Sequence, residues 1–175
     1  EALLRSAEAQ NRWFTNAFVQ DAMKANGEML RVEVLEKWLG DYPELQGQRE
    51  PKRIGLVLAG NLPMVGWHDV LCVLLTGHHA IVKCSSEDQV LIPAAIAALD
   101  SFSAEDVASR VEFETGTLND TDAVIATGSA NTNRYFEYYF RSLPKVLRSQ
   151  RTSVAVLSGS EPVSYTHLTL PTTPV

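Results

Sequence analysis

The chain has few cysteines, and they are not spaced as metal ligands. Only Cys72 and Cys84 occur among its 175 residues. This scarcity excludes the small secreted domains that depend on disulfides, and zinc modules built on Cys-x-x-Cys pairs. It favours a reducing cytoplasm. We interpret both thiols as small buried hydrophobic groups, as free cysteines commonly are.

The chain also lacks a basic excess and long hydrophobic runs. It has 15 Lys and Arg against 21 Asp and Glu, which gives a formal net charge of −6 and an isoelectric point of about 5.2. We therefore expect no nucleic-acid partner, since binding to the phosphate backbone requires a basic face. The apolar runs are too short to cross a bilayer and no signal segment opens the chain, so we expect no membrane span and a cytoplasmic location.

One segment is typical of a strand, a tight turn, a helix and a second strand. Residues 54–59 are an apolar run of strand length, and residues 60–63, Gly-Asn-Leu-Pro, are turn formers. The apolar stretch 65–75 predicts a helix that stops before Gly77, and residues 80–82 begin the next strand. Because both strands are almost wholly apolar, they predict a parallel sheet that is buried on both faces.

The order Asn-x-Pro, apolar helix, small-residue turn and strand closing in Lys-x-Ser resembles the cofactor domain of the aldehyde dehydrogenase superfamily. The segments GNLP, GWHDVL, LLTGHHAIVK and SSED resemble more closely its thioester-reducing branch, the LuxC-like acyl-CoA reductases. These four motifs stand in the family's order, and the likeness extends from about Trp13 to Glu161. The αβ alternation and the resemblance together predict an open doubly wound parallel sheet, preceded by N-terminal helices.

The chain is predicted to have three unequal parts. Residues 1–50 form a helical segment, with Thr15 as one N-cap and an amphipathic stretch from Met29 to Leu39. Residues 51–162 form an incomplete Rossmann-like NAD(P)-binding domain. Its further elements are expected to be the helix Gln89–Ser101, the strands Val111–Thr115 and Ala123–Ala126, a helix through Tyr135 to Phe140, and the strand Ser153–Leu157.

Residues 163–175, VSYTHLTLPTTPV, differ abruptly in composition from the rest. Reading VSYTHLTLPT back through the genetic code gives what looks like a transposon-based sequencing adapter, so we interpret this part as a non-native tail. We expect the family's catalytic domain, with its nucleophilic cysteine, to follow Pro162 in the intact enzyme. The present chain is then expected to be an inactive fragment.

Asn61 is the candidate catalytic residue. By the resemblance, its side-chain amide donates to the oxyanion that forms on the substrate, and an amide suits this task because it does not titrate. The alternative is that Asn61 only satisfies the turn. Neither Cys72 nor Cys84 matches the nucleophile's motif. Where aldehyde-oxidising relatives carry a general-base Glu, residues 147–152 read LRSQRT, which suits an acyl intermediate handled by hydride or thiol instead of water.

Lys83, Ser85 and Ser86 are candidate cofactor-binding residues at the end of the second strand. The resemblance implies that Lys83 contacts the adenosine ribose, and that Ser86 stands where NAD-using members place a Glu that repels a 2′-phosphate. This favours NADPH, although a shift of one residue would bring Glu87 into register and leave NADH possible. The alternative is a solvated loop that caps the next helix.

Residues Thr127, Gly128 and Ser129 match the family's Thr-Gly-Ser turn. In the family, the glycine permits close backbone approach and the helix N-terminus faces the cofactor phosphates. An ordinary helix cap is the alternative. The chain contains no Gly-x-Gly-x-x-Gly fingerprint.

The resemblance thus predicts an enzyme that reduces an acyl-CoA to the aldehyde with NADPH, through an acyl-cysteine, and that forms a homo-oligomer when intact. The alternatives are another member of the superfamily, or a dinucleotide-binding module without catalysis. The histidines lack the spacing of zinc ligands, so no metal is expected. We interpret the aromatic residues as packing residues rather than as a ligand cage. They are Trp13, Phe14, Trp38 and the cluster at Tyr135, Phe136, Tyr138, Tyr139 and Phe140.

Overall fold

The computed structural model describes residues 1–47, 50–103 and 106–149, which form a helical segment and a parallel sheet. The strands are β1 (Arg53–Val57), β2 (His79–Lys83), β3 (Val111–Phe113), β4 (Ala123–Thr127) and β5 (Lys145–Arg148). They lie in the order β3-β2-β1-β4-β5, and all neighbouring pairs are parallel. The apolar run predicted as a strand at residues 54–59 corresponds to β1, which is the central strand of the described sheet.

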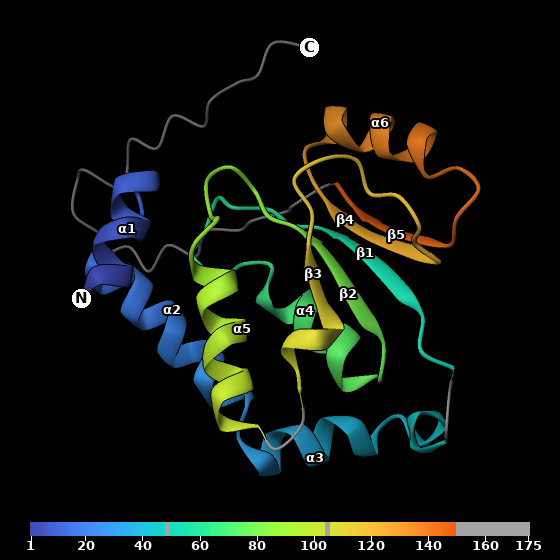
Figure 1. The fold of residues 1–175 in the computed structure, drawn as a ribbon, viewed down its shortest axis with the longest axis horizontal. Coiled ribbons are helices and arrows are strands. Elements are labelled where there is room, and N and C mark those ends of the chain that lie inside the picture. Colours follow the sequence, from blue (N-terminus) through green and yellow to red (C-terminus); the bar gives the residue numbers. More distant parts are fainter. Residues whose placement is uncertain (48–49, 104–105, 150–175) are drawn as a thin grey trace, which may run out of the picture.

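Helices connect the strands on both faces of the sheet. α4 (Trp67–Leu75) joins β1 to β2, α5 (Leu91–Phe102) joins β2 to β3, and α6 (Ala130–Tyr139) joins β4 to β5. Crossovers between parallel strands are right-handed. Because β2 lies on one side of β1, and β5 lies beyond β4 on the other, α4 and α6 occupy opposite faces (Figure 1). The predicted doubly wound α/β fold is confirmed.

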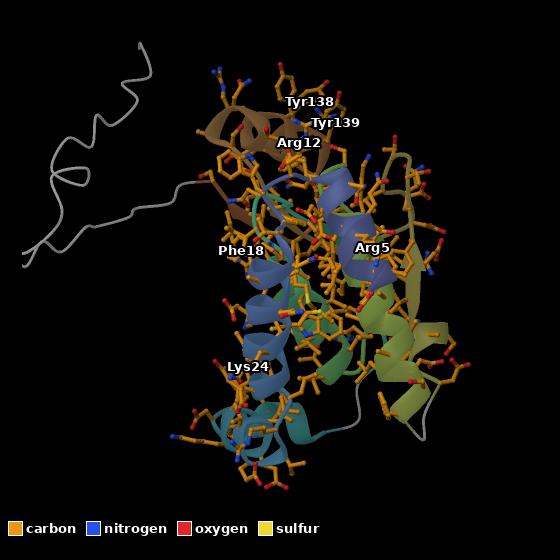
Figure 2. The ribbon with its side chains drawn as sticks, turned by 90° about the vertical axis from the view of Figure 1, so that its left-hand side faces the viewer. Arg5, Arg12, Phe18, Lys24, Tyr138 and Tyr139 are labelled. Carbon is orange, nitrogen blue, oxygen red and sulfur yellow. The ribbon has the colours of Figure 1, made fainter. Side chains whose placement is uncertain are left out.

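Three helices precede the sheet: α1 (Ala2–Gln10), α2 (Asn16–Met29) and α3 (Val32–Gly40), followed by a short 3₁₀ turn. Thr15 is the N-cap of α2, as predicted, and its hydroxyl accepts from the Phe18 N–H at 3.4 Å. Phe18 and Lys24 lie on the outer side of this helix (Figure 2). The amphipathic stretch from Met29 to Leu39 is not continuous, because the backbone turns between α2 and α3.

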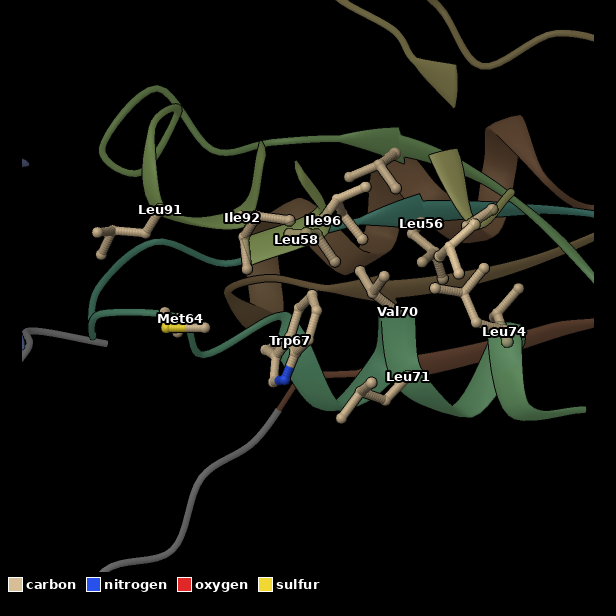
Figure 3. Packing of buried hydrophobic residues seen from close by; sticks show 14 of the residues in the cluster. Leu56, Leu58, Met64, Trp67, Val70, Leu71, Leu74, Leu91, Ile92 and Ile96 are labelled. Atoms are coloured by element: carbon tan, nitrogen blue, oxygen red, sulfur yellow. The ribbon is translucent and has the colours of Figure 1, made fainter. Parts of the chain in front are cut away.

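The core lies between the central strand and the helices α4 and α5 (Figure 3). Leu56 of β1 is fully buried among Val70 of α4 and Ile92 of α5, and burial of each such side chain stabilises the fold by about 1.5–3 kcal/mol. The N-terminal helices add residues to the same cluster. These are Ala7, Phe14 and Val19.

Some aromatic side chains lie on the surface, against expectation. Trp13 is 81% exposed while its neighbour Phe14 is 1% exposed, so only Phe14 is a packing anchor. On α6, Tyr138 and Tyr139 point outward and are more than half exposed (Figure 2). They contact each other edge to face, so their packing is local and not part of the core.

The strand β5 was not predicted, because its sequence Lys-Val-Leu-Arg is half charged and it lies at an edge of the described sheet. The predicted strand Ser153–Leu157 and the tail 163–175 lie outside the described residues. Among the helices that are described, none is long and apolar enough to cross a membrane.

Candidate active site

The predicted site residues all follow the carboxyl ends of neighbouring strands. Asn61 follows β1, Lys83 ends β2, and Thr127 ends β4. The strand order reverses between β1 and β4, since the chain winds away from β1 to one side and from β4 to the other. Ligands of open α/β sheets bind in the crevice at such a point. The topology therefore gathers these residues where a nucleotide would be expected.

A cavity of about 750 Å³, here called the Asn61 pocket, lies between these strand ends. Asn61, Ser85, Thr127 and the Gly128-Ser129 turn line its wall. Five of the seven predicted site residues thus face one space, although they come from three different loops. This geometry agrees with the predicted grouping, while their chemical roles remain predictions.

A second cavity of about 600 Å³, here called the Lys83 pocket, holds the remaining two predicted residues, Lys83 and Ser86. Ser85 lines both cavities, which makes them neighbours along the edge of the sheet. The Lys83 ammonium donates to the carbonyl oxygen of Gly116 in the connection between β3 and β4. That contact holds the cation beside the connection between β3 and β4.

The loops that carry Asn61 and Ser85 pass very close to each other. A Cβ atom at Gly60 would lie 2.6 Å from the Ser85 Cβ and Oγ atoms, so a larger residue would push these loops apart. At the other wall, a Cβ at Gly128 would lie 3.1 Å from Thr132 and Phe136. Gly60 is therefore required by close packing at the cavity wall, whereas a side chain at Gly128 would need its neighbours to move by a few tenths of an ångström.

Asp88 ties the same two loops together. Its carboxylate accepts from the Met64 N–H at 3.1 Å and from the Leu91 N–H, at the start of α5, at 3.2 Å. Met64 has a φ of 57°, a left-handed conformation that is uncommon for a side chain of its size. Burial raises the pKa of the Asp88 carboxyl, and the two N–H donors lower it in part.

The last residue of α1 and the residue after it support these loops from outside. The Gln10 amide donates to the Ser86 carbonyl at 3.1 Å and accepts from the Gln89 N–H at 2.9 Å. The adjacent Asn11, which is buried, donates to the Gly60 carbonyl at 3.5 Å. The N-terminal helices therefore help to shape the candidate site, a role that the sequence did not reveal.

Ser129 caps α6, as the alternative interpretation of this turn proposed. Its hydroxyl accepts from the Thr132 N–H at 3.1 Å. The cap does not exclude a ligand, because a helix N-terminus keeps further unpaired N–H groups and a partial positive charge. This helix start, which lines the Asn61 pocket, therefore fits a phosphate group.

A third cavity, of about 500 Å³ and here called the Arg148 pocket, adjoins the Asn61 pocket through Thr127. Its wall holds an ion pair in which one nitrogen of Arg148 lies 2.5 and 2.7 Å from the two carboxylate oxygens of Asp69. Asp69 is 5% exposed and lies in the first turn of α4. This pair joins α4 to the end of β5.

The two thiols are poor nucleophiles in this environment. Burial, and then the charge of Asp69, raises the pKa of Cys72. Burial, and then Asp88, raises the pKa of Cys84 to about 11. The sequence analysis predicted that both thiols are buried, but in the structure both side chains are only half-buried. Among the described residues, no cluster of His, Cys, Asp and Glu could hold a metal ion.

Sequence reasoning missed Asp69, Asp88, Gln10, Asn11 and Arg148 as part of this region. Asp88 had a weak local signal, since it lies two residues before Val90, the N-cap of α5, and Asp side chains near a helix start commonly accept from nearby backbone N–H groups. The other four act through contacts with residues far away in the sequence, and nothing in their own neighbourhood indicates those contacts.

Comparison with known proteins agrees with the resemblance. The sequence matches the family described as acyl-CoA reductase (LuxC) over residues 1–138. No curated protein and no solved structure matches the chain. The matched part includes α1 to α5 and the sheet as far as β4. It also includes all seven predicted site residues that line the Asn61 and Lys83 pockets.

Proposed function

The chain belongs to the acyl-CoA reductase (LuxC) family, and on that premise we propose that it binds NADPH along its Asn61 and Lys83 pockets for the reduction of an acyl-CoA to an aldehyde. The observation that carries this proposal is the convergence of Asn61, Ser85 and the Thr127–Ser129 turn on one cavity at the point where the strand order reverses. Acyl-CoA reduction is the activity that the family's description names.

The residues present fit a dinucleotide. The Ser129 end of α6 would hold the phosphates, since it is a helix N-terminus that lines the Asn61 pocket. Lys83 and Ser86 would hold the adenosine ribose. Their ammonium and hydroxyl groups would donate hydrogen bonds to a 2′-phosphate. When bound, the cofactor would supply the hydride.

Asn61 would act on the substrate. Its amide lies in the same cavity as Thr127 and is carried by a loop that Asp88 and Gly60 hold in place. There it would donate to the oxygen of the thioester carbonyl as negative charge develops on it. The acyl-cysteine intermediate would require a thiol other than Cys72 or Cys84, because burial keeps both of these protonated at neutral pH.

A second candidate function is a dinucleotide-binding module without catalysis of its own, because both thiols, Cys72 and Cys84, are half-buried. Titration of the chain with NADPH, followed by nicotinamide fluorescence, tests binding. Acyl-CoA-dependent consumption of NADPH tests catalysis. Saturable binding without consumption would identify the binding module, and the absence of binding would contradict both functions.

Ser86→Glu is expected to shift cofactor preference toward NADH by tenfold or more. A carboxylate near the ribose repels a 2′-phosphate, and at about 4 Å two charges at a protein surface interact by roughly 1–4 kcal/mol. The matched control is Ser86→Gln, which adds the same bulk without charge. The ratio of the two dissociation constants, measured by titration, checks this. If the ratio is unchanged in Ser86→Glu, Ser86 does not determine the preference.

Alkylation of the native chain by iodoacetamide is expected to be slow at neutral pH and to accelerate toward pH 11. Burial raises the pKa of Cys84 from 9.0 to about 11 in the folded state. Between these two pH values, the folded chain therefore keeps a thiol proton that the unfolded chain releases. The same difference should lower the free energy of unfolding as the pH rises from about 9 to about 11. Rapid labelling of Cys84 at pH 7, read by mass spectrometry, would contradict the raised pKa of this thiol.

A further inference from the structure

Helix α3 is amphipathic, yet none of its residues is buried. Its apolar side chains Leu35 and Trp38 are only half-buried, and Val34 is 45% exposed. They face a cavity of about 180 Å³ that separates α3 from α4. This space is a cavity that is partly open to solvent.

The wall of this cavity is almost entirely apolar. Met29, Leu35 and Trp38 come from the N-terminal helices, and Leu71, Cys72 and Leu75 come from α4. The Cys72 thiol does not add a charge, because burial keeps it protonated. A water molecule would find few hydrogen-bond partners on this wall, so the cavity favours an apolar guest.

The cavity runs along α4 and ends beside the polar site. His68, Leu71, Cys72 and Leu75 recur at helical spacing on one face of α4, a distance of about 10 Å along its axis. His68 forms the end that is nearer to the carboxyl edge of the sheet. Its Nδ1 lies 3.9 Å from an oxygen of Asp69, which lines the Arg148 pocket. This end of the cavity and Asp69 therefore lie on the same turn of α4.

We infer that the cavity between α3 and α4 binds the aliphatic end of the acyl chain, so that its volume limits the length of acyl group the enzyme accepts. This inference rests on the proposed function. An apolar cavity of about 150 Å³ accommodates a benzene-sized guest, so a cavity of about 180 Å³ holds roughly six carbon atoms. The space is too small for a nucleotide or for coenzyme A.

Trp38 supplies a direct test on the full chain. The probes are ω-bromodecanoic acid and its coenzyme A thioester, because bromine quenches tryptophan fluorescence on contact. Saturable quenching is expected, and Trp38→Phe is expected to remove most of it. Trp13→Phe is the control, since Trp13 is 81% exposed and would report binding to the outer surface. Quenching that does not saturate, or that persists in Trp38→Phe, would overturn the inference.

A pair of substitutions on α3 tests the volume. Val34 lines the cavity and Val32 does not, although both are exposed on the same helix. Val34→Phe is expected to weaken binding of the probe about tenfold or more, as loss of a methylene-sized space does in apolar pockets. Val32→Phe is expected to leave binding unchanged. Equal effects of both substitutions, with both variants folded by circular dichroism, would overturn the inference.

The outcomes separate this inference from the proposed function. NADPH binding without quenching of Trp38 overturns the acyl cavity and leaves the proposed function in place. Quenching of Trp38 without NADPH binding supports the acyl cavity and contradicts the cofactor proposal.

Discussion

Asp88→Ala is expected to lower the free energy of unfolding by about 3 kcal/mol, because it leaves two backbone N–H groups without an acceptor and each such loss costs about 1–3 kcal/mol. The two groups belong to Met64, in the loop after β1, and to Leu91, at the start of α5. Asp88 is 3% exposed, so water cannot easily replace the carboxylate. Urea denaturation followed by circular dichroism measures this change.

Asp106→Ala is the matched control. The Asp106 carboxylate also accepts from a backbone N–H, that of Ser109 at 2.9 Å, but it is exposed. Water can take its place, so the loss is expected to be under about 1 kcal/mol. Asp88→Asn should fall between the two, since an amide has one acceptor oxygen for two donors. Equal stabilities of Asp88→Ala and Asp106→Ala would show that the loops are held by other contacts.

Much of the fold could be predicted because its signals are local. β1, α4 and β2 combine apolar runs with the turn formers at 60–63 and the stop at Gly77, which has a φ of 81°. These features depend only on neighbours in the sequence. The position of Thr127 and Ser129 at a strand end and a helix start was predicted for the same reason.

The parts that could not be predicted depend on tertiary contacts. The strand β5 has charged residues at both ends, so its sequence does not have the apolar pattern of a buried strand. It pairs with β4, and Arg148 at its end binds Asp69, 79 residues earlier in the sequence. A hydrogen bond of that kind has no local pattern. The sequence therefore predicted which loops form the site but not what holds them.

The side chain of Asn61 illustrates the same division. The turn at residues 60–63 was predicted from its composition, whereas the other walls of its pocket come from the loop after β2, the end of β4 and the start of α6. Whether Asn61 is a catalytic donor or only a turn residue depends on chemistry at that cavity. Only a measurement that separates turnover from binding can distinguish these two roles.

Asn61→Ala, in a form of the enzyme that reduces acyl-CoA, is expected to lower turnover by about a hundredfold or more, as removal of one oxyanion donor does. The affinity for NADPH should change by less than about threefold, because an interaction made only in the transition state contributes to kcat and not to cofactor binding. Leu62→Ala is the matched control, since Leu62 lies in the same loop and is 44% exposed. It should leave both quantities nearly unchanged. If Asn61→Ala weakens NADPH binding and turnover in parallel, or if Leu62→Ala is equally damaging, the residue maintains the loop and does not act on the substrate.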